Sequence, residues 1–68
     1  MEIKWKGDFE IRFRIEGGTA VILADRDGLL SLAEQLATLA EEAPGSHIHY
    51  DEYNSLEVGS DELIIEKI

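Results

Sequence analysis

Apolar and polar residues alternate strictly over residues 9–15, which read Phe-Glu-Ile-Arg-Phe-Arg-Ile. This period of two is typical of a half-buried β-strand. We expect its four apolar side chains to face the core: Phe9, Ile11, Phe13 and Ile15. A shorter alternation at Ile3 and Trp5 precedes this segment, and the apolar run at residues 19–23 follows it. Because Gly7-Asp8 and Gly17-Gly18 are turn signals, the chain is predicted to open with a three-stranded meander.

A helical period replaces the alternation after Gly28. Apolar residues recur at spacings of three and four and form one stripe: Leu29, Leu32, Ala33, Leu36, Leu39, Ala40 and Ala43. An acidic residue at Asp25 or Asp27 suits the N-cap. Pro44 ends the pattern because proline lacks the amide that a helix requires. The stripe predicts one amphipathic helix that packs on one face of a sheet.

Two further strands are predicted after the helix. Residues 46–51 alternate again, and Leu63-Ile64-Ile65 begins the last apolar run. The polar stretch between them is expected to be a compact surface loop that Leu56 and Val58 pin down. The order β-β-β-α-β-β defines one α+β domain over residues 1–68, with a mainly antiparallel sheet and one helix on one face.

Composition narrows the class of protein. A chain of 68 residues has room for one core, and the absence of cysteine excludes disulfides and thiolate metal sites. The N-terminal residues lack the apolar region of a secretory signal, and no apolar run is long enough to span a bilayer. We therefore expect a cytoplasmic protein that contacts no membrane.

Charge is unevenly distributed. Fifteen acidic and six basic residues give a net charge of −9. Residues 41–68 hold eight acids and one base, a net of −7, whereas residues 1–40 hold seven acids and five bases, a net of −2. This field disfavours nucleic acid and anionic membranes and attracts basic proteins. The simpler alternative is that the acidic surface only keeps the protein in solution.

One motif resembles a metal site. His47, His49 and Asp51 are two residues apart, so they would share one face of a strand and offer imidazole and carboxylate ligands. However, His47 and His49 are the only histidines of the chain, so any further ligand would have to be an acid or water. Ile48 and Tyr50, on the opposite face of the strand, are better candidates for the core. We expect no metal and no other cofactor, with both histidines on the outer face.

Catalytic equipment is missing from the pattern. No cysteine is present, and no serine lies in a recognisable nucleophile turn. The acidic pairs Asp51-Glu52 and Asp61-Glu62 have polar surroundings, so nothing indicates the apolar pocket that would raise a carboxyl pKa for acid catalysis. We predict that the chain is not an enzyme.

Several segments after Asp27 resemble one family. They are residues 27–36 (Asp-Gly-Leu-Leu-Ser-Leu-Ala-Glu-Gln-Leu), 44–51 (Pro-Gly-Ser-His-Ile-His-Tyr-Asp), 54–56 (Asn-Ser-Leu) and 59–67 (Gly-Ser-Asp-Glu-Leu-Ile-Ile-Glu-Lys). The most specific piece is the His-x-His-x-Asp strand with the later Leu-x-x-Gly-Ser-x-Glu-Leu. These segments are similar to immunity protein 32 of bacterial polymorphic toxin systems. The resemblance implies a non-enzymatic inhibitor that binds and neutralises a toxin made by the same cell.

The acidic C-terminal part supplies the candidate contacts with a basic toxin. They are His47, His49, Asp51, Glu52, Tyr53, Glu57, Asp61 and Glu62. Tyr53 is the expected anchor because a tyrosine in a polar loop offers apolar area and a hydroxyl together. Two alternatives stay open. One is a homodimeric structural or regulatory domain that pairs through the edge strand at the start of the meander. The other is a metal-binding module at the histidine motif.

Overall fold

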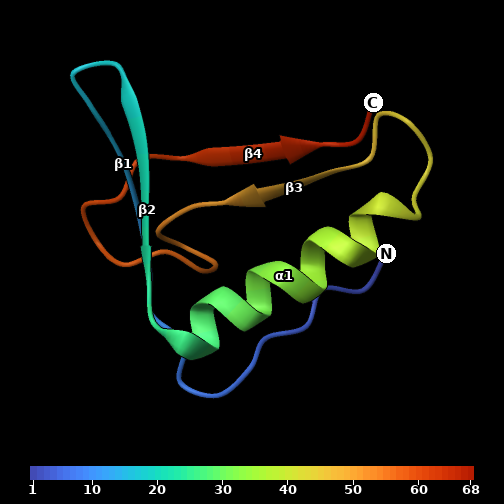
Figure 1. Ribbon diagram of the computed structural model, residues 1–68, viewed down its shortest axis with the longest axis horizontal. Helices are drawn as coiled ribbons and strands as arrows, with labels where there is room; N and C mark the ends of the chain where they lie inside the picture. The colour runs from blue at the N-terminus through green and yellow to red at the C-terminus, as the bar shows by residue number, and fades with distance from the viewer.

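Two β-hairpins flank a single helix in chain order (Figure 1). The computed structural model describes all residues from 1 to 68. Its elements are β1 (Ile11–Glu16), β2 (Thr19–Ala24), α1 (Arg26–Ala40), β3 (His47–Tyr50) and β4 (Leu63–Glu66). Both strand pairs are antiparallel: β1 pairs with β2, and β3 pairs with β4. The α+β class and its single helix are confirmed.

The first expected strand is not formed. Residues 1–10 run irregularly along the helix, and their backbone bonds to helix side chains rather than to a neighbouring strand. The Lys6 N–H donates to Ser31 Oγ at 2.8 Å, and Gln35 Nε2 donates to the Lys4 carbonyl at 2.7 Å. The observed order is therefore β-β-α-β-β.

The helix begins at a well-formed cap. Asp25 accepts the Gly28 N–H at 2.7 Å and the Glu10 N–H at 3.2 Å through one carboxylate oxygen. At Gly28 the helix touches the start of β1 closely, because an added Cβ would lie 2.7 Å from the carbonyl oxygen of Glu10, which precedes β1, and 2.9 Å from Ile11 Cγ1. The helix ends at Ala40, ahead of Pro44 as the sequence predicts.

The buried face of α1 differs from the predicted stripe. Leu32 and Leu39 are buried, but Leu29 and Leu36 are 55% and 43% exposed. Ser31 and Gln35 take their place in the interior. They are tolerated there because both have partners: Gln35 Oε1 accepts the Tyr50 hydroxyl at 2.8 Å, in addition to the contacts with residues 4 and 6. Burial of satisfied polar groups rotates the helix away from its most apolar direction.

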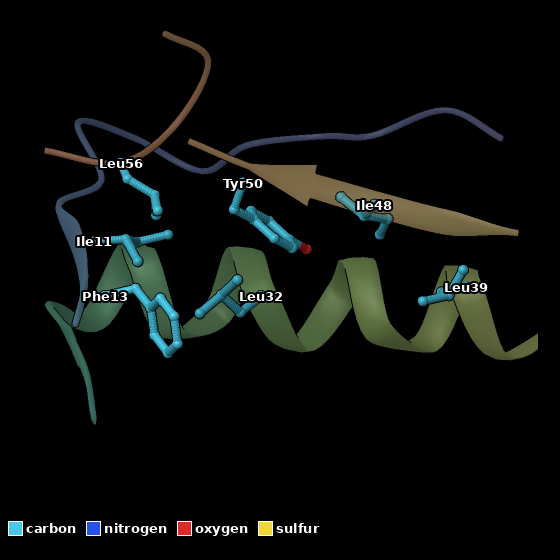
Figure 2. Packing of buried hydrophobic residues seen from close by; sticks show 7 residues of the cluster. All are labelled: Ile11, Phe13, Leu32, Leu39, Ile48, Tyr50 and Leu56. Atoms are coloured by element: carbon cyan, nitrogen blue, oxygen red, sulfur yellow. The ribbon is translucent and has the colours of Figure 1, made fainter. Parts of the chain in front are cut away.

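The core lies between the helix and the layer that contains β3 (Figure 2). It consists of seven side chains: Ile11, Phe13, Leu32, Leu39, Ile48, Tyr50 and Leu56. Trp5 stacks on Phe9 at 4.3 Å between ring centroids and meets Tyr50 edge-on at 6.2 Å. Ile15 was predicted to join the core but is 60% exposed, because the hairpin tip projects beyond the body of the molecule (Figure 1).

Candidate partner-binding surface

The connection between β3 and β4, residues 51–62, is here named the acidic loop, since it holds five acids and no base. Its first half is a tight turn built by Asp51. The Asp51 carboxylate accepts the N–H groups of Tyr53 and Asn54 at 2.9 and 3.1 Å. The Asp51 carbonyl accepts the N–H of Leu56 at 2.8 Å, and Leu56 is buried in the core. The turn is therefore fixed to the body of the protein.

The second half of the acidic loop covers the free edge of β1. The Glu57 N–H donates to the Ile11 carbonyl at 2.9 Å, and the Asp61 N–H donates to the Phe13 carbonyl at 2.7 Å. In return, the Phe13 N–H donates to Ser60 Oγ at 3.3 Å and the Ile15 N–H to Asp61 Oδ2 at 2.9 Å. Residue numbers increase in the same direction along the loop and along β1 in these bonds, so the segment runs parallel to β1. Four bonds give a loop without secondary structure a defined shape.

Two apolar side chains stand out of this loop into solvent. Tyr53 is 96% exposed and Val58 is 86% exposed. The expectation that Val58 pins the loop is wrong, whereas Leu56 does so. Val58 lies in a turn in which the Ser60 N–H donates to the Glu57 carbonyl at 3.2 Å, so its side chain is carried outward. The sequence signal was the neighbouring Gly59, whose φ of +94° marks that turn.

The five carboxylates of the acidic loop have different tasks. Asp51 and Asp61 accept backbone hydrogen bonds that hold the loop, and Glu52 accepts the Gly59 N–H at 2.7 Å, which ties its two halves together. Glu57 and Glu62 make no side-chain hydrogen bond or ion pair. All four ion pairs of the protein lie outside the loop: Lys6 with Glu34, Arg12 with Glu10, Arg14 with Glu16, and the N-terminus with Glu42. Its negative charge is thus not neutralised within the chain.

Both histidines lie on the outer face of β3, as predicted from the burial of Ile48 and Tyr50. Their rings meet edge-on at 4.8 Å between centroids, and His47 Nδ1 is 3.0 Å from the Gly45 carbonyl oxygen. Asp51 does not join them, since its carboxylate faces the turn that it caps. No group of three potential ligands converges anywhere in the structure, so the metal-module alternative has no geometric support.

Neither a pocket nor a cleft is present on the surface. Burial raises the pKa of the Tyr50 phenol, whose hydroxyl lies in the interior on Gln35. This shift belongs to the packing of the core, since Tyr50 is fully buried. No helix combines the length and the apolar content that crossing a membrane requires.

The fold and the acidic loop define a small α+β domain with a preformed, exposed loop surface rather than a cavity. Residues 19–68 match the family model of immunity protein 32, and the chain belongs to that family. No curated protein and no solved structure matches it. The matched residues include the whole acidic loop but not β1, against which the second half of that loop is held.

Proposed function

We propose that this protein is a non-enzymatic immunity protein that binds and neutralises a cognate bacterial toxin through the acidic loop. Membership of the immunity protein 32 family supports a toxin as the partner. The observation that carries the proposal is the exposure of Tyr53 and Val58 on a loop that hydrogen bonds hold in one shape. Solvent-exposed apolar groups on a fixed scaffold lose little conformational freedom on binding, which favours tight association.

Charge indicates the chemistry of the partner. The loop carries five acids without a compensating base, and Glu57 and Glu62 are not engaged within the chain. A basic toxin surface, such as the substrate site of a nuclease, would complement it. Such complementarity increases the association rate and the selectivity more than the affinity itself. Tyr53 and Val58 then supply the apolar contact, and His47 and His49 extend the surface along β3.

The test begins with the toxin encoded beside this gene. Co-expression of the two should protect the host cell, and purified toxin should bind the protein. Tyr53→Ala should weaken binding by roughly 30-fold, the loss typical of a central aromatic contact of about 2 kcal/mol. Asp51 and Asp61 are left intact because their loss would disturb the loop itself.

A charge-matched pair of variants separates interface from bulk charge. Glu57→Gln with Glu62→Gln removes two charges from the acidic loop. Glu2→Gln with Glu41→Gln removes two exposed charges from the region where the N-terminus meets the end of α1, at the other end of the molecule (Figure 1). The first pair should slow association several-fold at low salt, and the control pair should not. Equal effects of both pairs, or unchanged binding by Tyr53→Ala, would refute the loop as the contact surface.

A further inference from the structure

The outer edge of β2 has no partner, and at six residues it is longer than the free edges of the four-residue strands β3 and β4, which pair only with each other. β1 is bonded on both sides, by β2 and by the acidic loop, but no backbone hydrogen bond joins β2 to any segment other than β1. Gly17 and Gly18 form a two-residue hairpin loop with φ values of +53° and +84°, so Glu16 and Thr19 are a hydrogen-bonded pair. Along an antiparallel strand the backbone groups of successive residues point alternately toward the paired strand and away from it. The N–H and C=O groups of Ala20, Ile22 and Ala24 therefore point away from β1.

The same alternation is visible on β1, which supports this assignment. Its outward residues are Ile11, Phe13 and Ile15, and the backbone groups of these three residues bond to the acidic loop. Six residues at about 3.4 Å each give β2 a free edge of roughly 20 Å.

The β2 edge also lacks the features by which proteins usually block strand addition. β2 reads Thr-Ala-Val-Ile-Leu-Ala and contains no charge, no proline and no bulge. Ile22 is 46% exposed and Leu23 is 39% exposed. On the face that points toward the core, Ile22 is paired with Phe13 and Ala20 with exposed Ile15. Hydrogen-bonding groups and apolar side chains are therefore offered together.

An apolar flank of α1 begins where β2 ends, because the helix starts two residues after the strand and touches it at that junction (Figure 1). Leu29 and Leu36 are seven residues apart and share that flank with exposed Ala33 and Ala40. By helical spacing, the acids Glu34, Glu41 and Glu42 fall on the opposite flank, where Lys6 and the N-terminus pair with two of them. The one carboxylate between β2 and this flank is that of Asp25, and its Oδ1 is engaged by the N–H groups of Gly28 and Glu10.

We propose that the β2 edge pairs antiparallel with the β2 edge of a second copy of this chain, which makes one four-stranded sheet across a two-fold axis. Two molecules of charge −9 repel each other, and β2 with its helix flank is where they meet without opposed carboxylates. A basic toxin gains no charge attraction there, whereas the acidic loop provides it. The protein also exposes eleven large apolar side chains against seven buried ones, so a second copy adds core to a small domain.

Geometry fixes the pairing. Outward groups occur at Ala20, Ile22 and Ala24, and a two-fold register centred on Ile22 uses all three, with Ile22 opposite its own copy. A standard interface of about 800 Å² per partner is roughly a sixth of the 4601 Å² surface of this protein. The proposal does not depend on the toxin, since it concerns the protein alone.

Sedimentation of the isolated full chain tests the proposal, with Ile22→Lys as the blocking variant. Ile64→Lys is a matched control, because Ile64 on β4 is 48% exposed and carries the same side chain. From about 1 to 100 μM the native protein and Ile64→Lys should sediment as dimers, and Ile22→Lys should raise the dissociation constant at least ~10-fold. Circular dichroism confirms that each variant is folded. If Ile22→Lys is not, Ala20→Pro removes one outward N–H without adding charge.

Cysteine cross-linking supplies a second measurement, since the native chain contains no cysteine. Ile22→Cys should form an intermolecular disulfide on mild oxidation, and Ile64→Cys should not. A native protein that stays monomeric over the whole concentration range overturns the proposal. So does a dimer that Ile64→Lys, rather than Ile22→Lys, disrupts. A monomer whose toxin binding is abolished by Ile22→Lys overturns it too, because the edge then receives the toxin.

Discussion

Asp61 Oδ2 accepts the backbone N–H of Ile15 at 2.9 Å, although the two residues are 46 positions apart in the chain. The Asp61 N–H simultaneously donates to the Phe13 carbonyl at 2.7 Å. Asp61 therefore makes two of the four hydrogen bonds by which the acidic loop closes the edge of β1. This relationship makes Asp61 a structural residue of the acidic loop, whereas its neighbour Glu62 has no such contact.

Asp61→Ala should consequently lower the free energy of unfolding by about 1–2 kcal/mol, since the Ile15 N–H loses a charged acceptor. Glu62→Ala should change stability by less than about 0.5 kcal/mol, as is usual for surface positions without partners. Urea denaturation followed by Trp5 fluorescence measures both. Equal stability of the two variants would show that the Asp61 bond contributes nothing.

A second long-range hydrogen bond, from the Tyr50 hydroxyl to Gln35 Oε1, lies in the core. Gln35→Leu leaves the Tyr50 hydroxyl and the Lys4 carbonyl without their partner and should destabilise the protein by about 2–4 kcal/mol. Tyr50→Phe should cost about 1–2 kcal/mol. Combining the two removes the orphaned hydroxyl, so the double variant should be about 1 kcal/mol more stable than the sum of the single losses. Additive losses in a double-mutant cycle would argue that the two side chains are not coupled.

The raised pKa of Tyr50 predicts a loss of stability in alkali. Burial keeps the phenol protonated in the folded protein, while the unfolded chain ionises near its ordinary value of about 10. Stability from this group is complete below that value and falls as the pH rises toward the folded pKa. Tyr53→Phe leaves Tyr50 as the sole tyrosine, so tyrosinate absorbance then reports Tyr50 alone. Its appearance should coincide with unfolding rather than precede it.

At Gly28 we expect a substitution by alanine to change stability in the direction opposite to that given by helix propensity. Glycine to alanine inside a helix normally stabilises by about 1 kcal/mol. Here the new Cβ would lie 2.7 Å from the Glu10 carbonyl oxygen and 2.9 Å from Ile11 Cγ1. Gly28→Ala should therefore destabilise by about 1–3 kcal/mol. Ala33→Gly, at an exposed position of the same helix, should cost only its propensity of about 1 kcal/mol. A thermal melt of each variant would expose a stabilising Gly28→Ala, which contradicts the close contact.

The sequence was most informative where one period dominated. The alternation over residues 9–15 and 46–51 and the helical spacing after Gly28 predicted strands and a helix where β1, β3 and α1 lie, together with the outward histidines. It failed where long-range polar contacts decide the structure. The alternation at Ile3 and Trp5 resembles a strand, but Ser31 and Gln35 bind that segment to the helix. No local pattern reveals such partners.

The residue composition of the candidate surface could be predicted from the sequence, but not which of its acidic residues hold the loop in shape. The excess of acids and the position of Tyr53 were visible in the sequence. The structural roles of Asp51, Glu52 and Asp61 depend on which backbone groups lie nearby, and those belong to the Gly59 turn and to β1. The prediction for Val58 was wrong, because an isolated apolar residue was expected to be buried and its side chain is exposed.

The parallel association of the acidic loop with β1 also sets the timing of folding on the ribosome. β1 is synthesised early, but the groups that bond its outer edge follow 46 positions later. At roughly 5–20 residues per second, β1 waits about 2–9 s for them. During that interval the nascent hairpin has two open edges instead of one, so the newborn chain is most vulnerable to mispairing with a neighbour before Asp61 emerges.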